Sequence, residues 1–398
     1  MRMMADFQIQ FSRSRIVCRP GAVDSLAAEV DALGARRLML VCGTRSASGM
    51  AALRVRAALG ERLAVQWTGI PPHSGVADVT ALSARAREAG VDGFIAVGGG
   101  SASDSAKAAA ILLAEGGTLR DHANVFTPPD QYVQKTLPAT KLPVIAIPTT
   151  LSAAEVTPGL GIRDEHGHKL VFWDPGVVPR LIVLDPQAVL DVPASVWATT
   201  GMNALAHCIE GLYSRVRNPV SDALALQGIG HLSRALPKVV SYGRAGNAIE
   251  LLAALEEALT GALLSGLVIS NARVGIHHGV CHGLGSLGGL SHGVANSILL
   301  PHAMRFNLEV ASGPLARAAE ALGCDVRGWP ERQAAEAAVQ AVERLQRAIG
   351  VPTRLSEAGL DRALLPRLAR GAMSDRGLYF NPRLATEAEV LALLEAAW

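Results

Sequence analysis

Histidines are concentrated in one short part of the chain. Of the eleven histidines in 398 residues, five lie between positions 277 and 302, where even spacing would place fewer than one. Imidazoles bind transition metals and exchange protons near neutral pH. His278 and His282 are four residues apart, so a helix would put them on one face. His292 follows after a glycine-rich stretch, where we expect a loop. The five are His277, His278, His282, His292 and His302.

A second polar face lies earlier in the chain. Asn203, His207 and Glu210 are spaced i, i+4 and i+7, which places them on one side of a helix. Imidazoles on two helices can point at one ion, and a loop histidine can complete the site. The alternative is that these are ordinary hydrogen-bonded histidines, which is the role we expect for His277 and His302. Glu210 is expected to support a neighbour rather than to coordinate an ion.

A glycine turn lies between an apolar run at residues 94–97 and a helical pattern at 103–114. Glycines let the backbone approach phosphates, and free N–H groups at a helix start attract them. The pattern therefore predicts a pyrophosphate site, although a plain tight turn is the alternative. The turn consists of Gly98, Gly99, Gly100 and Ser101.

A second turn, with Thr149 and Thr150 after Pro148, follows the apolar run at residues 142–147. Open α/β sheets bind ligands at the carboxyl ends of their strands, so these hydroxyls could face a ligand. Threonines that bond their own backbone are the alternative.

The run at residues 37–42 is followed by Gly43, where an acidic residue would hydrogen-bond a ribose 2′-OH and repel a 2′-phosphate. The glycine removes that carboxylate, and Arg37 or Arg45 could neutralise a phosphate. We therefore expect NADPH to be accepted as well as NADH, unless the arginines are merely solvated.

These candidate residues require two kinds of supporting element. Four near-continuous apolar runs suit strands buried on both faces of a parallel sheet, and helical patterns separate them. After about residue 193 the strand signal fades, and apolar residues recur at helical steps of three and four. We predict an α/β domain with an open, mostly parallel sheet over residues 1–193 and an all-helical domain over 194–398. The four runs lie at 37–42, 94–97, 142–147 and 181–184.

Composition excludes several classes of protein. Apolar residues make up 49% of the chain and the net charge is +2, with no long basic run. Binding to nucleic acid or a membrane surface would need a dense cationic face, so neither is expected. We see no apolar stretch of bilayer-spanning length and no signal peptide. Five cysteines without CxxC pairing indicate reduced thiols and a cytoplasmic location.

Four segments in this order resemble the iron-containing (group III) alcohol dehydrogenase superfamily. They are GGGSASDSAK (98–107), PTTLSAAEVTP (148–158), TTGMNALAHCIEGLYS (199–214) and HGVCHGLGSLGGLSHGVANSILLPH (278–302). The resemblance implies a dehydroquinate synthase-like architecture, with a dinucleotide-binding α/β domain, a helical domain and an active site between them. It also implies NADH or NADPH, a divalent metal such as iron or zinc, and a homodimer.

The resemblance assigns roles position by position. The glycine turn would hold the cofactor pyrophosphate, and Thr149 and Thr150 would line its nicotinamide end. Asp104 matches a polar residue near substrate and cofactor, and His282 matches a histidine credited with proton relay or substrate polarisation. The family's metal ligands fall on Asn203, His207, His278 and His292.

Asn203 departs from the pattern, because metal-dependent members have Asp there. A neutral carboxamide oxygen is a weaker donor than a carboxylate, although three imidazoles can still hold an ion. Asn at this position resembles the maleylacetate reductase branch, which reduces maleylacetate to 3-oxoadipate. In such an enzyme His282, His278 and Asn203 would act on the substrate. The alternative is a metal-dependent alcohol dehydrogenase or aldehyde reductase.

Overall fold

The computed structural model describes residues 7–9, 11–72 and 74–398. Its first half is built on a six-stranded sheet in the order β1-β10-β7-β4-β2-β3, with every pair of neighbours parallel. Every residue of β2, β4, β7 and β10 is buried, as predicted from the four apolar runs. The strands are β1 (Arg15–Cys18), β2 (Leu38–Cys42), β3 (Leu63–Trp67), β4 (Gly93–Gly98), β7 (Val144–Pro148) and β10 (Leu181–Leu184).

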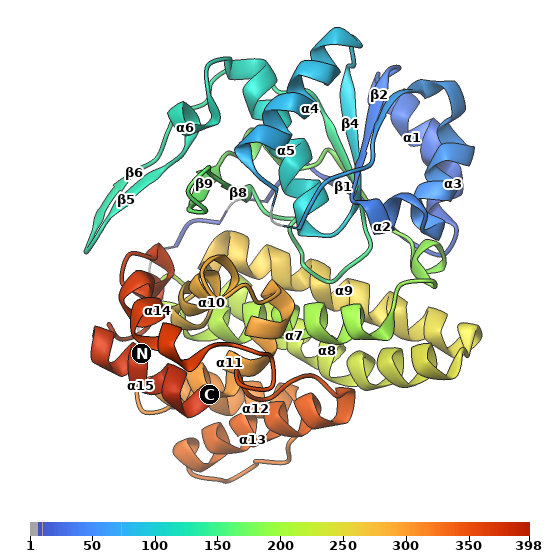
Figure 1. Cartoon of the computed structure of the whole chain (residues 1–398). Helices are drawn as coiled ribbons and strands as arrows, with labels where there is room; N and C mark the ends of the chain where they lie inside the picture. Colours follow the sequence, from blue (N-terminus) through green and yellow to red (C-terminus); the bar gives the residue numbers. More distant parts are fainter. Residues whose placement is uncertain (1–6, 10, 73) are drawn as a thin grey trace.

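Helices cover both faces of this sheet (Figure 1). Alternate residues of β2 face opposite sides: Leu40 packs in the cluster that includes α1 and α3, whereas Met39 packs with α4 and α5. This layering confirms the predicted open α/β fold class. The helices of this half are α1 (Leu26–Ala32), α2 (Thr44–Ala47), α3 (Met50–Leu59), α4 (Val76–Glu88), α5 (Gly100–Glu115) and α6 (Leu119–His122).

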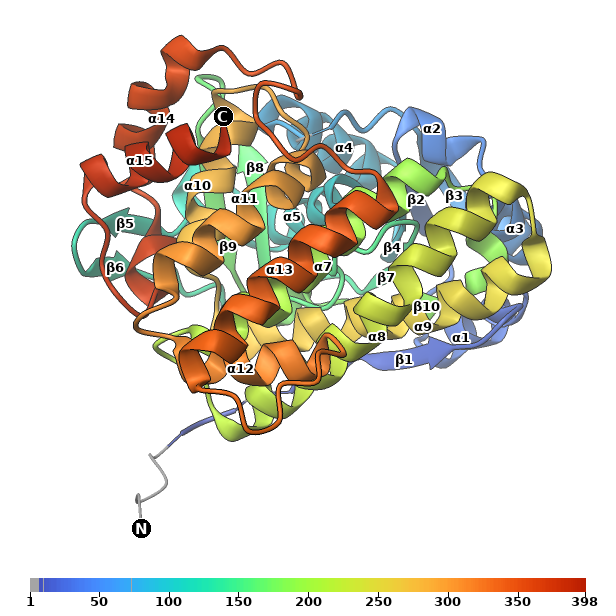
Figure 2. The same ribbon diagram turned by 90° about the horizontal axis from the view of Figure 1, so that it is seen from below.

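The second half is helical, as predicted, and its first helix begins at Ala194, next to the predicted boundary. In Figure 1, α7, α8 and α9 lie side by side beneath the sheet, and the view from below in Figure 2 shows them from their outer side. The helices are α7 (Ala194–Tyr213), α8 (Pro219–Ala245), α9 (Ala248–Ala272), α10 (Ile276–Ser286), α11 (His292–Asn307), α12 (Ser312–Ala321), α13 (Glu331–Ile349), α14 (Leu365–Ala372) and α15 (Glu387–Ala397). Short 3-10 turns complete the chain: η1 (Ala22–Ser25), η2 (Gly60–Arg62), η3 (Pro175–Val177), η4 (Pro186–Val189), η5 (Arg362–Leu364) and η6 (Arg376–Phe380).

Helix α9 corrects the expectation that no apolar stretch is long enough to span a bilayer. It is long and apolar enough to cross a bilayer by length and composition alone, and no other helix in the described residues is. Half of its most apolar stretch is buried inside the protein, and it packs along α7 and α8. A core helix of a helical bundle passes the same compositional test, because it too is apolar around much of its circumference.

Two antiparallel hairpins were not predicted from the sequence. The first joins β5 (Val125–Thr127) to β6 (Gln131–Val133), and the second joins β8 (Gly159–Arg163) to β9 (Lys169–Trp173). Their strands are short and partly exposed, and the apolar run at residues 170–173 of β9 was not recognised as a strand. The second hairpin reaches the helical half, since the Arg163 guanidinium donates a hydrogen bond to the Gly285 carbonyl at 3.0 Å.

Candidate active site

Three helices of the second half bring four imidazoles together. His207 lies on α7, His278 and His282 lie on α10, and His292 is the first residue of α11. The rings of His207 and His278 stack with centroids 4.7 Å apart, and His292 lies 5.6 Å from His278 and 5.9 Å from His282. We expected His292 to lie in a loop, but it begins a helix. The hydroxyl of Ser291 caps its helix by accepting from the Val294 amide at 3.4 Å.

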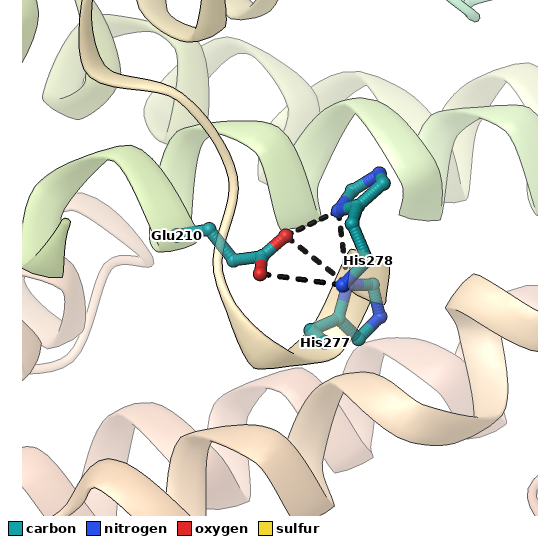
Figure 3. Close-up of side chains that lie close together, drawn as sticks. All are labelled: Glu210, His277 and His278. Carbon is teal, nitrogen blue, oxygen red and sulfur yellow. Dashed lines mark hydrogen bonds and ion pairs between the residues drawn. The ribbon is translucent and has the colours of Figure 1, made fainter. Parts of the chain in front are cut away.

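Glu210 lies behind these rings and is buried with His277 and His278 (Figure 3). Its carboxylate accepts from the Nδ1 of His278, from His277 Nδ1 at 3.3 Å and from the Gly275 amide at 2.7 Å. Burial alone would raise the pKa of Glu210, but His278 and His277 beside it hold the pKa well below its ordinary value. Glu210 therefore supports α10 as a carboxylate.

These three side chains are close enough to hold a metal ion, because their ligand atoms lie within 4.8 Å of one another. They already satisfy one another, however. His277 also places Nε2 at 3.0 Å from the Asn296 carbonyl, so both of its nitrogens face acceptors. Burial opposes the charged form of His277, but Cys281 and Glu210 outweigh it and raise its pKa. We interpret the group as the support that orients His278.

The support fixes which nitrogen of His278 faces Asn203. Burial lowers the pKa of His278 to about 4, against the pull of Glu210, so the ring is neutral at pH 7. With its Nδ1 hydrogen donated to Glu210, Nε2 carries a lone pair and faces the Asn203 Oδ1 at 3.2 Å. Two acceptors at this distance repel, and two arrangements relieve this. Either the Asn203 amide turns so that its nitrogen donates to Nε2, or a cation lies between them.

The donor set fits a divalent ion. Two ligands about 2.1 Å from a tetrahedral ion lie about 3.4 Å apart, close to the separation of Nε2 and Oδ1 here. Burial lowers the pKa of His207 and of His292, which keeps both rings neutral and able to coordinate. Asn203, His207, His278 and His292 would therefore hold the ion.

A pocket of about 300 Å³ lies between the two halves. His207, His282, His292 and Asn203 line it from the helical half, whereas His278 is buried. Residues from the glycine turn, the threonine turn and α5 line the opposite wall. These residues are Gly100, Ser101, Asp104 and Thr150.

The glycine turn and the threonine turn are packed against each other. β4 ends at Gly98, Gly99 precedes α5, and a Cβ at Gly99 would lie 3.0 Å from Thr150 Cγ2. The Thr149 amide donates to the Gly98 carbonyl at 2.9 Å. The turn thus exposes a helix start beside the pocket, and only glycine fits there without moving its neighbour.

Asp104, one turn into α5, is half-buried at the wall of the pocket and accepts from the Gly161 amide at 3.1 Å. Burial raises the pKa of Asp104, and Lys107 and Lys169 partly offset this. Asp104 therefore joins the first turn of α5 to the hairpin β8–β9.

The structure corrects part of the ribose prediction. Gly43 follows β2 at its carboxyl end, and a Cβ there would lie 3.1 Å from the Ile70 carbonyl. Arg45 is exposed on α2, near this end. Arg37 precedes β2 at the opposite end of the strand and donates to the Ala89 carbonyl at 2.9 Å, so it cannot serve a phosphate at the pocket.

Three pocket or near-pocket residues lay outside the predicted site. Arg163 and Lys169, from the hairpin β8–β9, line the pocket. Asp375 lies next to His282, with Oδ2 2.7 Å from Nδ1. Two other arginines of the chain have different partners: Arg273 stacks on Trp173, and Arg383 pairs with Glu389. A long-range contact such as that of Asp375 leaves no signal in local spacing.

The α/β fold, the helical half and a pocket in which the glycine turn faces a histidine cluster define the class of this protein as an oxidoreductase, as the following matches show. Family models described as "Iron-containing alcohol dehydrogenase" and "Fe-containing alcohol dehydrogenase family, C-terminal" match residues 13–186 and 197–398. The chain belongs to the iron-containing alcohol dehydrogenase family. Members of this family use a nicotinamide dinucleotide and iron or another divalent metal.

Relatives include enzymes with different substrates. 1,3-Propanediol dehydrogenase of Klebsiella pneumoniae is 32% identical over 386 residues, which is 95% of this chain and 96% of that protein. Maleylacetate reductase of Sphingobium indicum is 30% identical over 383 residues, covering 96% and 95%. The crystal structure of a 1,3-propanediol oxidoreductase matches with a TM-score of 0.91 at 30% identity, covering 99% of this chain and 100% of that one.

Proposed function

We propose that the protein reduces the carbonyl group of a small carboxylate-bearing substrate with NADH or NADPH, in the manner of a maleylacetate reductase. The observation that carries this proposal is the pair of cations, Arg163 and Lys169, in the pocket that also contains Asn203 and His282. A pocket for a neutral alcohol or aldehyde needs no cations, whereas a keto acid needs counter-charges.

Both cations extend from the hairpin β8–β9, and contacts fix the course of each side chain. Arg163 gives one of its five N–H donors to the Gly285 carbonyl, which anchors the guanidinium beside α10. Lys169 passes directly over Gly161, where a Cβ would lie 1.9 Å from its Cε. Gly161 therefore leaves the space through which the lysine side chain runs, and both charges can face one substrate carboxylate.

The cofactor is expected at the glycine turn, with its pyrophosphate at the start of α5. When bound, the nicotinamide supplies a hydride to the carbonyl carbon. The residues of the chain would then stabilise the charge that develops on the carbonyl oxygen. The Asn203 amide would donate to that oxygen, and His282 would deliver the proton that completes the alcohol.

A second candidate is a metal-dependent alcohol dehydrogenase. It is favoured by the fit of Asn203, His207, His278 and His292 to a divalent ion, and by the likeness to the 1,3-propanediol oxidoreductase structure. An ion held there would act as a Lewis acid on the substrate oxygen.

The charge of the pocket separates these functions. In Arg163→Ala, kcat/KM for the keto acid is expected to fall about 10–100-fold, since a hydrogen bond to a charged group contributes about 1.5–3 kcal/mol. Turnover of a neutral aldehyde should change less than twofold. Arg120→Ala is the matched control, because Arg120 pairs with Asp164 in the same hairpin. An equal loss with both substrates, or turnover of the aldehyde alone, contradicts the proposed substrate class.

Dialysis against EDTA tests the second candidate. A maleylacetate reductase-like enzyme should keep its activity after chelation, because the proposed reduction uses Asn203 and His282 and needs no ion. Asn203 also supplies no negative charge that would retain one. Loss of activity on chelation, with recovery on adding Fe²⁺ or Zn²⁺, would favour the alcohol dehydrogenase.

A further inference from the structure

His282 has a carboxylate partner that comes from a distant part of the chain. Its Nδ1 lies 2.7 Å from Oδ2 of Asp375, which directly precedes η6, 93 residues further along. We infer that Asp375 is a positioning residue, which holds His282 in the orientation and tautomer that present Nε2 to the pocket. The role in turnover rests on the proposed reduction, but the tautomer itself does not.

The two oxygens of Asp375 have separate tasks. Oδ1 accepts from the Gly377 amide at 2.7 Å and so caps η6, while Oδ2 faces the imidazole. Because the backbone bond fixes the carboxylate, its second oxygen is pre-aimed at His282. An ordinary helix cap would use only one of these oxygens.

Glycines allow η6 to reach α10. A Cβ at Gly279 would lie 2.3 Å from Leu378 Cδ1, and a Cβ at Gly377 would lie 3.0 Å from the Gly275 carbonyl. Gly279 is one turn before His282 on the same helix. The close contact of η6 with α10 is therefore what brings Asp375 to the histidine.

Residues of the first half also contact η6. Arg376, the next residue after Asp375, stacks on the Tyr132 ring at 3.3 Å from its centroid. Tyr379 contacts Phe126 edge to face, with ring centroids 5.1 Å apart. Tyr132 and Phe126 belong to the hairpin β5–β6, so both halves of the protein fix the position of η6.

The arrangement decides what Nε2 can do. When Nδ1–H is donated to Asp375, neutral His282 carries its lone pair at Nε2, where it can accept the proton of an alcohol. In the reductive direction, the imidazolium would give its Nε2 proton to the carbonyl oxygen, while a bound dihydronicotinamide would supply the hydride to the carbonyl carbon. The C=O group becomes CH–OH, the cofactor is oxidised, and neutral His282 takes its next proton from water. Asp375 remains ionised throughout and steadies the imidazolium.

Asp375→Asn tests this role. Its amide can donate to Nδ1, which favours the tautomer with hydrogen on Nε2 and removes the carboxylate that steadies the imidazolium needed for reduction. We expect kcat to fall about 100-fold, with substrate KM and cofactor affinity within about twofold. In the His282→Ala background, adding Asp375→Asn should lower kcat by less than about twofold relative to His282→Ala alone. Asp361→Asn is the matched control, because Asp361 caps η5 in the same way and accepts from the Ala363 amide.

A spectroscopic measurement needs no substrate. In protein labelled with ¹⁵N-histidine, the His282 signals, assigned by their loss in His282→Ala, should show hydrogen on Nδ1 in the parent and on Nε2 in Asp375→Asn. Asp375→Glu, which keeps a carboxylate, should retain the parent tautomer if Asp375→Asn fails to fold. The inference is overturned if the parent carries hydrogen on Nε2. It is also overturned if Asp375→Asn lowers kcat by the same factor of about 100 when it is introduced into His282→Ala. If no keto acid or aldehyde is turned over, the proposed function fails while the tautomer result still decides this inference.

Discussion

The buried Glu210 offers a sharp test of how the histidine cluster is held. Replacing it with Gln keeps its shape and allows the amide oxygen to accept from the Gly275 and His278 backbone N–H groups, at 2.7 and 3.3 Å. The amide nitrogen then takes the position of the oxygen that faces His277 and His278. The substitution therefore replaces a carboxylate oxygen that accepts from the His277 and His278 rings with a neutral N–H donor.

The magnitude follows from burial. The side chains of Glu210 and His277 are both fully buried, and removing one partner of such a pair costs about 3–5 kcal/mol. We expect Glu210→Gln to lower the free energy of unfolding by that amount at pH 7. This is a large part of the 5–15 kcal/mol that stabilises a typical domain. His278 should also change tautomer, with hydrogen on Nε2, which would remove its lone pair from Asn203.

Urea denaturation followed by circular dichroism measures this loss. Glu155→Gln is the matched control, because Glu155 is also a buried glutamate but burial raises its pKa to about 7. Its carboxyl group is therefore largely uncharged below neutral pH, and the substitution should not lower the free energy of unfolding at pH 7. Equal losses in the two variants would refute the claim that the charge of Glu210, rather than the shape of its side chain, holds the cluster.

Three further outcomes are expected. Because the folded pKa of Glu155 lies above its ordinary value of 4.5, the folded state retains the proton and stability falls by about 3 kcal/mol as pH rises from about 4.5 to 7; urea titrations should show that Glu155→Gln removes this fall. Gly279→Ala should cost about 1–3 kcal/mol and lower kcat, because its Cβ would lie 2.3 Å from Leu378 Cδ1. Gly283→Ala, with only a 3.5 Å contact, should be neutral or stabilising in thermal unfolding. With Gly43 after β2, NADPH should be used at a KM within about tenfold of that for NADH, and steady-state kinetics that show strong rejection of NADPH would contradict this reading.

Local pattern predicted much of the architecture. Continuous apolar runs identified the four buried strands, and steps of three and four residues identified most of the helices of the second half, since burial imposes these periods on the sequence. The edge strands β1 and β3 and the two hairpins were missed. Most of their residues are partly exposed and their apolar runs are mostly short, so hydrophobicity marks them less clearly than the buried strands, although β9 contains four apolar residues in a row.

The same limit applies to the site. Helical spacing placed Asn203, His207 and Glu210 on one face of α7, and His278 and His282 on one side of α10, because these relations are set within one helix. Strand direction could have excluded Arg37, which lies at the amino end of β2.

Only the folded chain decided which distant groups meet this face. Asp375 reaches His282 across 93 residues, and the hairpin β8–β9 brings Arg163 and Lys169 to the same pocket. Such contacts depend on how whole elements pack, through glycines that permit close approach and aromatic rings that clamp η6. The sequence alone therefore determined the elements and the chemical groups they carry, whereas the tertiary structure determined the partners that orient those groups.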